Sequence, residues 1–343
     1  MNQGNAILIV GPAWVGDMVM AQSLFIRLRQ QDPNCRIDVL APSWSLPLLA
    51  RMPEVHRAIE LPLGHGKLGL MSRRRLGRSL RKEAYDRAIV LPRSFKAALI
   101  PWFAKAKQRS GFLGEMRFGL LNDIRPLDKS ILTQTVQRFV ALGESANAAQ
   151  PPTMPVPQLQ VDPQNQRRLV ARFSLTGEGP LLALLPGAEY GPAKQWPATH
   201  YAQLAENLSD RGWRVLIIGS KKDHETAESI SRQSRAEILN LCGQTELVDA
   251  IDLIAACDAV VTNDSGLMHI AAAVNTPLLA LYGSSTPAYT PPLSEQAATC
   301  YLALSCSPCF KRQCPLGHTR CLTELKVSDV MARFDELLGK REV

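Results

Sequence analysis

The stretch that decides the fold is residues 6–17, which read AILIV followed by GPAWVGD. A five-residue apolar run of this kind is typical of a buried strand. The stretch Met18–Arg29 follows directly, and its apolar residues, among them Leu24, Phe25 and Leu28, recur at helical spacing. A strand, a glycine-containing turn and a helix in this order predict the opening of a parallel α/β sheet.

The same alternation of short apolar runs and amphipathic stretches continues along the chain. The strands that we expect are 6–10, 36–41, 58–61, 87–91, 181–185, 214–218, 236–241, 259–262 and 278–281. The helices that we expect are 18–29, 68–82, 95–104, 201–208, 225–233, 248–256 and 267–273. The pattern predicts two doubly wound, Rossmann-like parallel-sheet domains that face each other across a cleft.

A proline-rich stretch separates the two runs of alternation. It holds Pro151, Pro152, Pro155, Pro157 and Pro163, and such a composition favours a stiff linker. We therefore expect an N-terminal domain over residues 1–150, a linker over 151–163 and a C-terminal domain over 164–326. A last helix is expected in 327–343.

The bulk composition limits the class of protein. The chain has 343 residues, of which 46% are hydrophobic, and this is ordinary for a folded protein. Its formal charge of +8 favours anionic partners, which include nucleic acid, an acidic membrane surface and phosphorylated substrates. Aromatic residues make up only 6%, and no groove-reading helix or base-stacking platform is evident, which argues against a nucleic-acid-binding protein. No signal peptide or membrane-spanning run is visible, so we expect a cytoplasmic protein.

The first loop comes close to two phosphate-binding motifs and satisfies neither of them. Ala13 stands where a dinucleotide fingerprint needs glycine, and Asp17 stands where a P-loop needs lysine. A carboxylate at a strand-to-helix turn has two interpretations. Asp17 either takes a proton from an attacking hydroxyl as a general base, or merely matches the charge of its helix N-terminus.

Two loops in the second half indicate a diphosphate site. Lys194, in the run Lys194–Pro197, offers one positive charge, although it also fits a surface lysine beside a core tryptophan. The small residues Ser265 and Gly266 follow a strand and open a helix, whose N-terminal N–H groups attract anions. Asp264 is suited to accept hydrogen bonds from sugar hydroxyls, and Asp264 and Ser265 are also ordinary helix caps. His269 is either a ligand contact or a packing histidine.

Together these segments resemble the ADP-heptose:lipopolysaccharide heptosyltransferases, an inverting family with the two-domain GT-B fold. The resemblance is carried by Val15-Gly16-Asp17, by Lys194–Pro197 and by residues 263–273, which read NDSGLMHIAAA, in the family's order over nearly the whole chain. This sequence has Asp-Ser-Gly where other members have Asp-Thr-Gly, a change that keeps the hydroxyl.

The resemblance implies that the last helix, in 327–343, packs back on the N-terminal domain. It also implies roles for the matching residues. It implies that Asp17 is the catalytic base and that Lys194 contacts the diphosphate of ADP-heptose. Further donor contacts are implied for Glu225, which would hold the ribose, and for Asp264, Ser265, Gly266 and His269. An inverting transfer needs one base and stabilisation of the leaving diphosphate, so we expect no metal ligand and no cofactor.

The acceptor that the resemblance implies is the heptose- and Kdo-bearing lipid A of the lipopolysaccharide inner core. Arg93 and Lys96 follow a strand end, and we expect them to bind this anionic acceptor. A family member with a different core acceptor remains the alternative. The basic run from Arg73 to Lys82 is either a solvated helix face or a peripheral contact with the anionic inner membrane.

Five cysteines gather near the C-terminus, at positions 300, 306, 309, 314 and 321. The spacing Cys306-x-x-Cys309 suits a metal knuckle, although the full order fits no standard zinc module. In a reducing cytoplasm they are equally explained as free thiols. A cysteine-rich loop is similar to that of the family members which add the second heptose.

Overall fold

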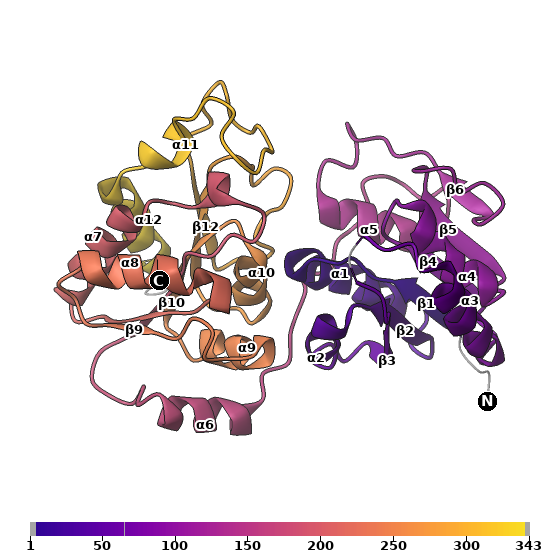
Figure 1. Cartoon of the computed structure of the whole chain (residues 1–343), viewed down its shortest axis with the longest axis horizontal. Helices are drawn as coiled ribbons and strands as arrows, with labels where there is room; N and C mark the ends of the chain where they lie inside the picture. Colours follow the sequence, from indigo (N-terminus) through magenta and orange to yellow (C-terminus); the bar gives the residue numbers. More distant parts are fainter. Residues whose placement is uncertain (1–4, 65, 340–343) are drawn as a thin grey trace. The chain divides into compact units, whose positions relative to one another are not determined.

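The chain forms two compact units, Met1–Pro157 and Gln158–Val343, in the computed structural model, which describes residues 5–64 and 66–339 (Figure 1). The boundary falls inside the proline-rich stretch that was expected to be a linker. Each unit is built on one six-stranded sheet in which every strand pair is parallel.

The first sheet has the strand order β3-β2-β1-β4-β5-β6. Its strands are β1 (Ala6–Val10), β2 (Arg36–Ala41), β3 (Val55–Glu60), β4 (Arg87–Val90), β5 (Gln108–Phe112) and β6 (Asp123–Arg125). The chain runs outward from β1 to β3 and then returns to the other side of β1 with β4. The gap between the ends of β1 and β4 is therefore the topological switch point, where sheets of this kind bind ligands.

Helices cover both faces of this sheet. They are α1 (Val15–Gln31), α2 (Leu46–Leu49), α3 (Leu70–Ser79), α4 (Leu99–Phe103) and α5 (Thr135–Gly143). Leu8 and Val10 point into the core beneath α3 and α4, so the alternate residues Ile7 and Ile9 face the other side. Burial on both faces explains why the strand reads as one continuous apolar run.

The second sheet repeats the strand order of the first, β12-β11-β10-β7-β8-β9. Its strands are β7 (Leu181–Leu185), β8 (Arg214–Ile217), β9 (Ile238–Asn240), β10 (Ala259–Asn263), β11 (Leu278–Tyr282) and β12 (Ala297–Tyr301). The switch point here lies between the ends of β7 and β10. These are the strands that lead into the Lys194 and Asp264 loops.

The helices of the second unit include the last helix of the chain. They are α6 (Pro163–Arg172), α7 (Ala198–Ser209), α8 (His224–Gln233), α9 (Leu247–Ala255), α10 (Gly266–Ala273), α11 (Arg320–Thr323) and α12 (Val327–Gly339). Val330 and Phe334 of α12 are fully buried in the second core, where the helix packs against α7 and β12. The apolar face of α12 is thus used within its own unit, and the packing of the segment 327–343 on the N-terminal domain stays a prediction.

None of the helices in the described ranges combines the length and the apolar character that a bilayer crossing requires.

Candidate active site

The switch point of the first unit gathers the predicted catalytic and acceptor residues. Asp17 lies in the first turn of α1, directly after β1, and its side chain is half-buried. Arg93 and Lys96 lie in the segment after β4, the neighbour of β1. The fold thus brings one carboxylate and two cations, which are far apart in the sequence, to the same edge of one sheet.

A buried arginine fixes the segment that carries Arg93. The guanidinium of Arg117 is 3% exposed and donates to the carbonyl of Pro92 at 2.8 Å. Arg93 Nε donates to the carbonyl of Leu113 at 3.2 Å, and the N–H of Phe95 donates to the Glu115 carboxylate at 2.6 Å. Burial lowers the pKa of Arg117, with a smaller contribution from the charge of Arg93. Arg117 could not be singled out from the sequence, because its partners lie in a loop with no regular pattern.

A short ion pair lies at the switch point of the second unit. Lys194 Nζ and Asp264 Oδ2 are 2.5 Å apart, although the two residues are separated by 70 positions. Lys194 follows β7 and Asp264 follows the adjacent strand β10. The Asp264 side chain is 5% exposed and that of Lys194 is 17% exposed, so the pair is shielded from water. Lys194 is therefore a partly buried cation at the switch-point edge of the sheet, and its ammonium group is paired with Asp264.

Two hydroxyl groups complete the environment of Asp264. Ser285 Oγ donates to Oδ2 at 2.5 Å, and Thr290 Oγ1 lies 3.5 Å from Oδ1. Oδ2 is thus occupied by both Lys194 and Ser285, whereas Oδ1 has the weaker contact. Neither Ser285 nor Thr290 was predicted, because a hydroxyl after a strand is too common to indicate a site.

Asn263 joins the two loops of this site. Its Nδ2 donates to the carbonyl of Pro186 at 2.6 Å, and its Oδ1 accepts the Trp196 N–H and the Tyr201 hydroxyl, both at 3.1 Å. One amide at the end of β10 therefore holds the loop that follows β7. This network explains why an asparagine precedes Asp264.

The helix α10 begins where the diphosphate was expected. Ser265 is its N-cap residue, but the Ser265 side chain makes no capping hydrogen bond, and Gly266 is the first helical residue. His269 is 4% exposed, and burial lowers its pKa to about 4, so the imidazole is neutral at physiological pH. The structure thus places His269 inside the core behind the loop, as a packing histidine would be.

Glu225 occupies a more peripheral position than the other predicted donor residues. It is exposed in the first turn of α8, after β8, the other neighbour of β7. A nearby ion pair joins Lys222 to Glu189 across 2.5 Å, between the loops after β8 and β7. Glu225 therefore lies at the same sheet edge, outside the buried Lys194–Asp264 pair.

Comparison with known proteins gives consistent matches along the chain. The sequence model of glycosyltransferase family 9 (heptosyltransferase) matches residues 73–320. Lipopolysaccharide heptosyltransferase 2 of Escherichia coli K12 is 48% identical over 345 residues, which cover 98% of this chain and 99% of the relative. Lipooligosaccharide heptosyltransferase 2 of Haemophilus influenzae is 54% identical over 302 residues, which cover 85% of this chain and 87% of the relative.

A solved structure matches both units. The E. coli ADP-heptose lps heptosyltransferase II has a TM-score of 0.86 and 46% sequence identity, with 98% of this chain and 100% of that chain covered. The expected fold class, GT-B with two Rossmann-like parallel sheets, is thereby confirmed.

Proposed function

This chain belongs to glycosyltransferase family 9, the heptosyltransferases, and we propose that it moves a heptose from ADP-heptose onto the first heptose of heptosyl-Kdo2-lipid A. It is a glycosyltransferase with heptosyltransferase II activity in lipopolysaccharide inner-core biosynthesis. The single observation that supports our account of its chemistry is the buried Lys194–Asp264 pair at the switch point of the second sheet.

Asp17 is the proposed general base. The acceptor hydroxyl gives its proton to the Asp17 carboxylate while its oxygen forms a bond to the anomeric carbon of the heptose. The bond from that carbon to the diphosphate oxygen breaks at the same time, and ADP leaves with the electron pair. The half-buried position of Asp17 at the end of the central strand supports this role.

Lys194 is the proposed contact to the departing diphosphate. Its ammonium group is held by Asp264, and Asp264 is held in turn by Ser285, so the cation needs little reorganisation when charge develops on the leaving group. The N–H groups that begin α10, next to Ser265 and Gly266, supply further stabilisation of anionic oxygen. Oδ1 of Asp264 is suited to accept a sugar hydroxyl, and Glu225 to accept those of the ribose.

On the acceptor side, the residues that we propose as contacts are positively charged. We assign Arg93 and Lys96 to the acidic groups of the Kdo- and heptose-bearing lipid. Arg117 has a positioning role, because it holds the backbone of the segment that carries Arg93. No metal is required in the transfer step, since Lys194 and backbone N–H groups meet the charge of the diphosphate.

We further propose that α3 contacts the anionic cytoplasmic face of the inner membrane. Within the basic run, Arg73 is buried and donates to the carbonyl of Leu68, whereas Arg75 and Arg78 are exposed. Met71 is 69% exposed at the start of the same helix. Exposed apolar residues beside exposed arginines are typical of a surface that lies on a bilayer.

This membrane contact is tested with anionic and neutral phospholipid vesicles. Arg78→Glu should weaken salt-sensitive sedimentation with anionic vesicles, while Lys129→Glu, another exposed basic position of the first unit, should have little effect. Equal binding of both variants and the original protein to anionic vesicles would rule out α3 as the contact.

The assignment of Asp17 is tested by comparing two substitutions. Asp17→Asn preserves shape but removes the base, so the transfer rate should fall about 10²–10⁴-fold while ADP affinity stays within about twofold. Lys194→Ala should instead weaken ADP binding as well as transfer, because the charge on the diphosphate is left unmet.

Single-turnover kinetics and calorimetric titration with ADP separate the two effects. If Asp17→Asn transfers heptose at a near-normal rate, Asp17 is not the base. If Lys194→Ala binds ADP with unchanged affinity, the assigned phosphate contact is wrong.

A further inference from the structure

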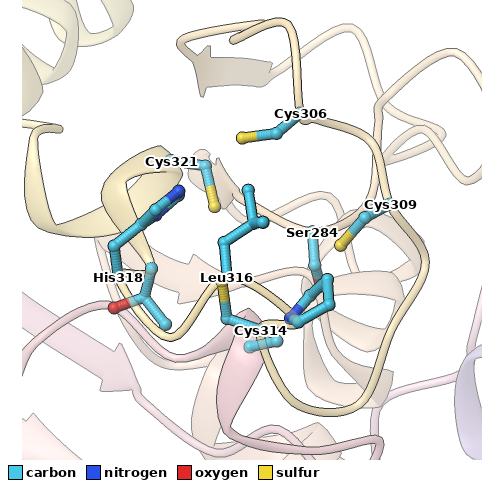
Figure 2. Close-up of a pocket in the computed structure, with 10 residues that line it drawn as sticks. Ser284, Cys306, Cys309, Cys314, Leu316, His318 and Cys321 are labelled. Atoms are coloured by element: carbon cyan, nitrogen blue, oxygen red, sulfur yellow. The ribbon is translucent and has the colours of Figure 1, made fainter.

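Four of the five clustered cysteines line one cavity in the second unit. Cys306, Cys309, Cys314 and Cys321 line a cavity of about 30 Å³ (Figure 2). His318 lines the same cavity. The fifth cysteine, Cys300, is buried in β12 among core side chains. The fold therefore separates the five cysteines into one thiol buried in the core and four thiols that line the same cavity.

A tight turn follows Cys314. The N–H of Gly317 donates to the carbonyl of Cys314 at 3.1 Å. Gly317 and Thr319 have positive φ angles of 73° and 47°, so the chain changes direction twice before it reaches Cys321.

A buried hydroxyl that lines the cavity lacks a partner. Ser284 is 1% exposed, and within the described ranges its Oγ has no hydrogen-bond partner. Figure 2 shows its side chain at the edge of the space between Cys309 and Cys314. Buried hydroxyls are almost always paired, and a metal-bound thiolate at this point would supply the missing acceptor.

The loop that carries three of these cysteines is attached to the donor half of the site. We call residues 302–319 the cysteine loop. The N–H of Phe310 donates to the carbonyl of Ser284 at 2.7 Å, and the N–H of Ala193 donates to the carbonyl of Arg312 at 3.1 Å. The Tyr190 hydroxyl donates to the carbonyl of Phe310 at 2.8 Å. The cysteine loop thus packs on the segment that leads to Lys194.

We propose that Cys306, Cys309, Cys314 and Cys321 bind one divalent ion of the zinc class as a structural site. Four thiolates are the preferred tetrahedral donor set for zinc, and the Cys306-x-x-Cys309 spacing is typical of such sites. Each thiol loses its proton to solvent as its sulfur binds the ion.

Binding requires only local movement. In residues 5–64 and 66–339, no three His, Cys, Asp or Glu side chains are already close enough to hold an ion. Leu316 lies among the sulfurs in Figure 2, yet 62% of it is exposed, so its side chain is free to turn toward solvent. The cysteine side chains then need to rotate inward over the small cavity. The ion would fix the cysteine loop, and through it the segment of Lys194.

The test is the metal content of the full-length protein, purified without chelator after expression with added zinc. Elemental analysis should find about one zinc per chain. Cys306→Ser, Cys309→Ser, Cys314→Ser and Cys321→Ser should each lose most of it. Cys300→Ala is the matched control, because it removes a clustered thiol that does not line the cavity, and it should keep the zinc.

A second measurement does not depend on whether the variants fold. Cobalt(II) added to the metal-stripped protein should give the intense sulfur-to-metal absorption and the visible bands of a tetrahedral thiolate site. The proposal is overturned if the protein holds no zinc and gives no such bands, if mass spectrometry shows a disulfide among these cysteines instead, or if Cys300→Ala loses zinc as the others do. None of these readouts depends on heptose transfer.

Discussion

At the scale of single residues, a series of hydrogen bonds connects the polar side chains at the switch point of the second sheet. Asn263 holds the loop after β7, Ser285 holds Asp264, and Asp264 holds Lys194. These contacts fix a cation at the switch point where we propose that the diphosphate binds. Pre-organisation of that kind is what makes a charge effective in stabilising a transition state.

His269 makes a pH-dependent contribution to stability. Its pKa is lowered from 6.5 to about 4, chiefly by burial, so the unfolded chain takes up this proton at a higher pH than the folded protein does. The stabilisation is complete above about pH 6.5 and is lost as the pH falls toward 4, by about 3 kcal/mol in total. His269→Gln cannot titrate there, so its stability should depend less on pH.

The measurement is the free energy of unfolding in urea for both proteins at several pH values between about 4 and 7.5. The two curves should converge as the pH falls, because only the original protein loses the histidine contribution. Parallel curves would show that His269 does not titrate in this range and that it is less buried than described.

The sequence singled out charged residues that the structure brings together, but it did not indicate their connections. Lys194 and Asp264 were both identified, yet no pattern indicated that they bind each other, because the contact depends on β7 and β10 being adjacent. Ser285 and Arg117 were missed for the same reason. His269 was left open between a ligand contact and a packing residue, and its burial favours the second.

At the scale of elements, the buried strands were the easiest to predict. Residues 6–10, 36–41 and 181–185 were predicted with the bounds that the structure has, since most residues of each strand are apolar and buried. The strand β5 and the edge strand β6 were missed, because sheet pairing rather than an apolar pattern defines them. The helix α6 was missed because its segment is polar and begins with a proline. Leu169 is the one residue of this helix that is buried.

A glycine in α3 sets how closely two helices of the first unit pack. A Cβ at Gly77 would lie 2.4 Å from Phe103 Cβ and 2.8 Å from the carbonyl oxygen of Ile100 in α4. Replacing glycine by alanine inside a helix ordinarily stabilises it by up to about 1 kcal/mol. Gly77→Ala should instead destabilise the protein by about 1–3 kcal/mol, because backbone atoms of α4 must move.

Thermal unfolding, compared with that of Gly64→Ala, tests this prediction. A Cβ added at Gly64 would meet no atom within 4 Å, so this replacement should leave stability unchanged or slightly raised. If Gly77→Ala were as stable as the original protein, α3 would pack on α4 less tightly than described. The position of α3, which carries the proposed membrane contact, would then also be less well fixed.

At the scale of the whole molecule, the two units have the same strand order but carry different chemistry. The first has a carboxylate and cations at its switch point, which we propose for the anionic acceptor, and the second has a partly buried cation and a helix N-terminus, which we propose for the diphosphate. The net charge of +8 agrees with a donor and an acceptor that are both anionic. The two-sheet organisation was predictable because each half repeats the strand–helix alternation, although the packing of α12 was not.

The most direct test of the proposed activity is transfer from ADP-heptose to two acceptors, Kdo2-lipid A and its mono-heptosylated form. We predict product on the mono-heptosylated acceptor and none on Kdo2-lipid A, with Asp17→Asn inactive on both. Transfer to Kdo2-lipid A, or to neither acceptor while ADP still binds, would contradict the assignment of this chain to the second heptose.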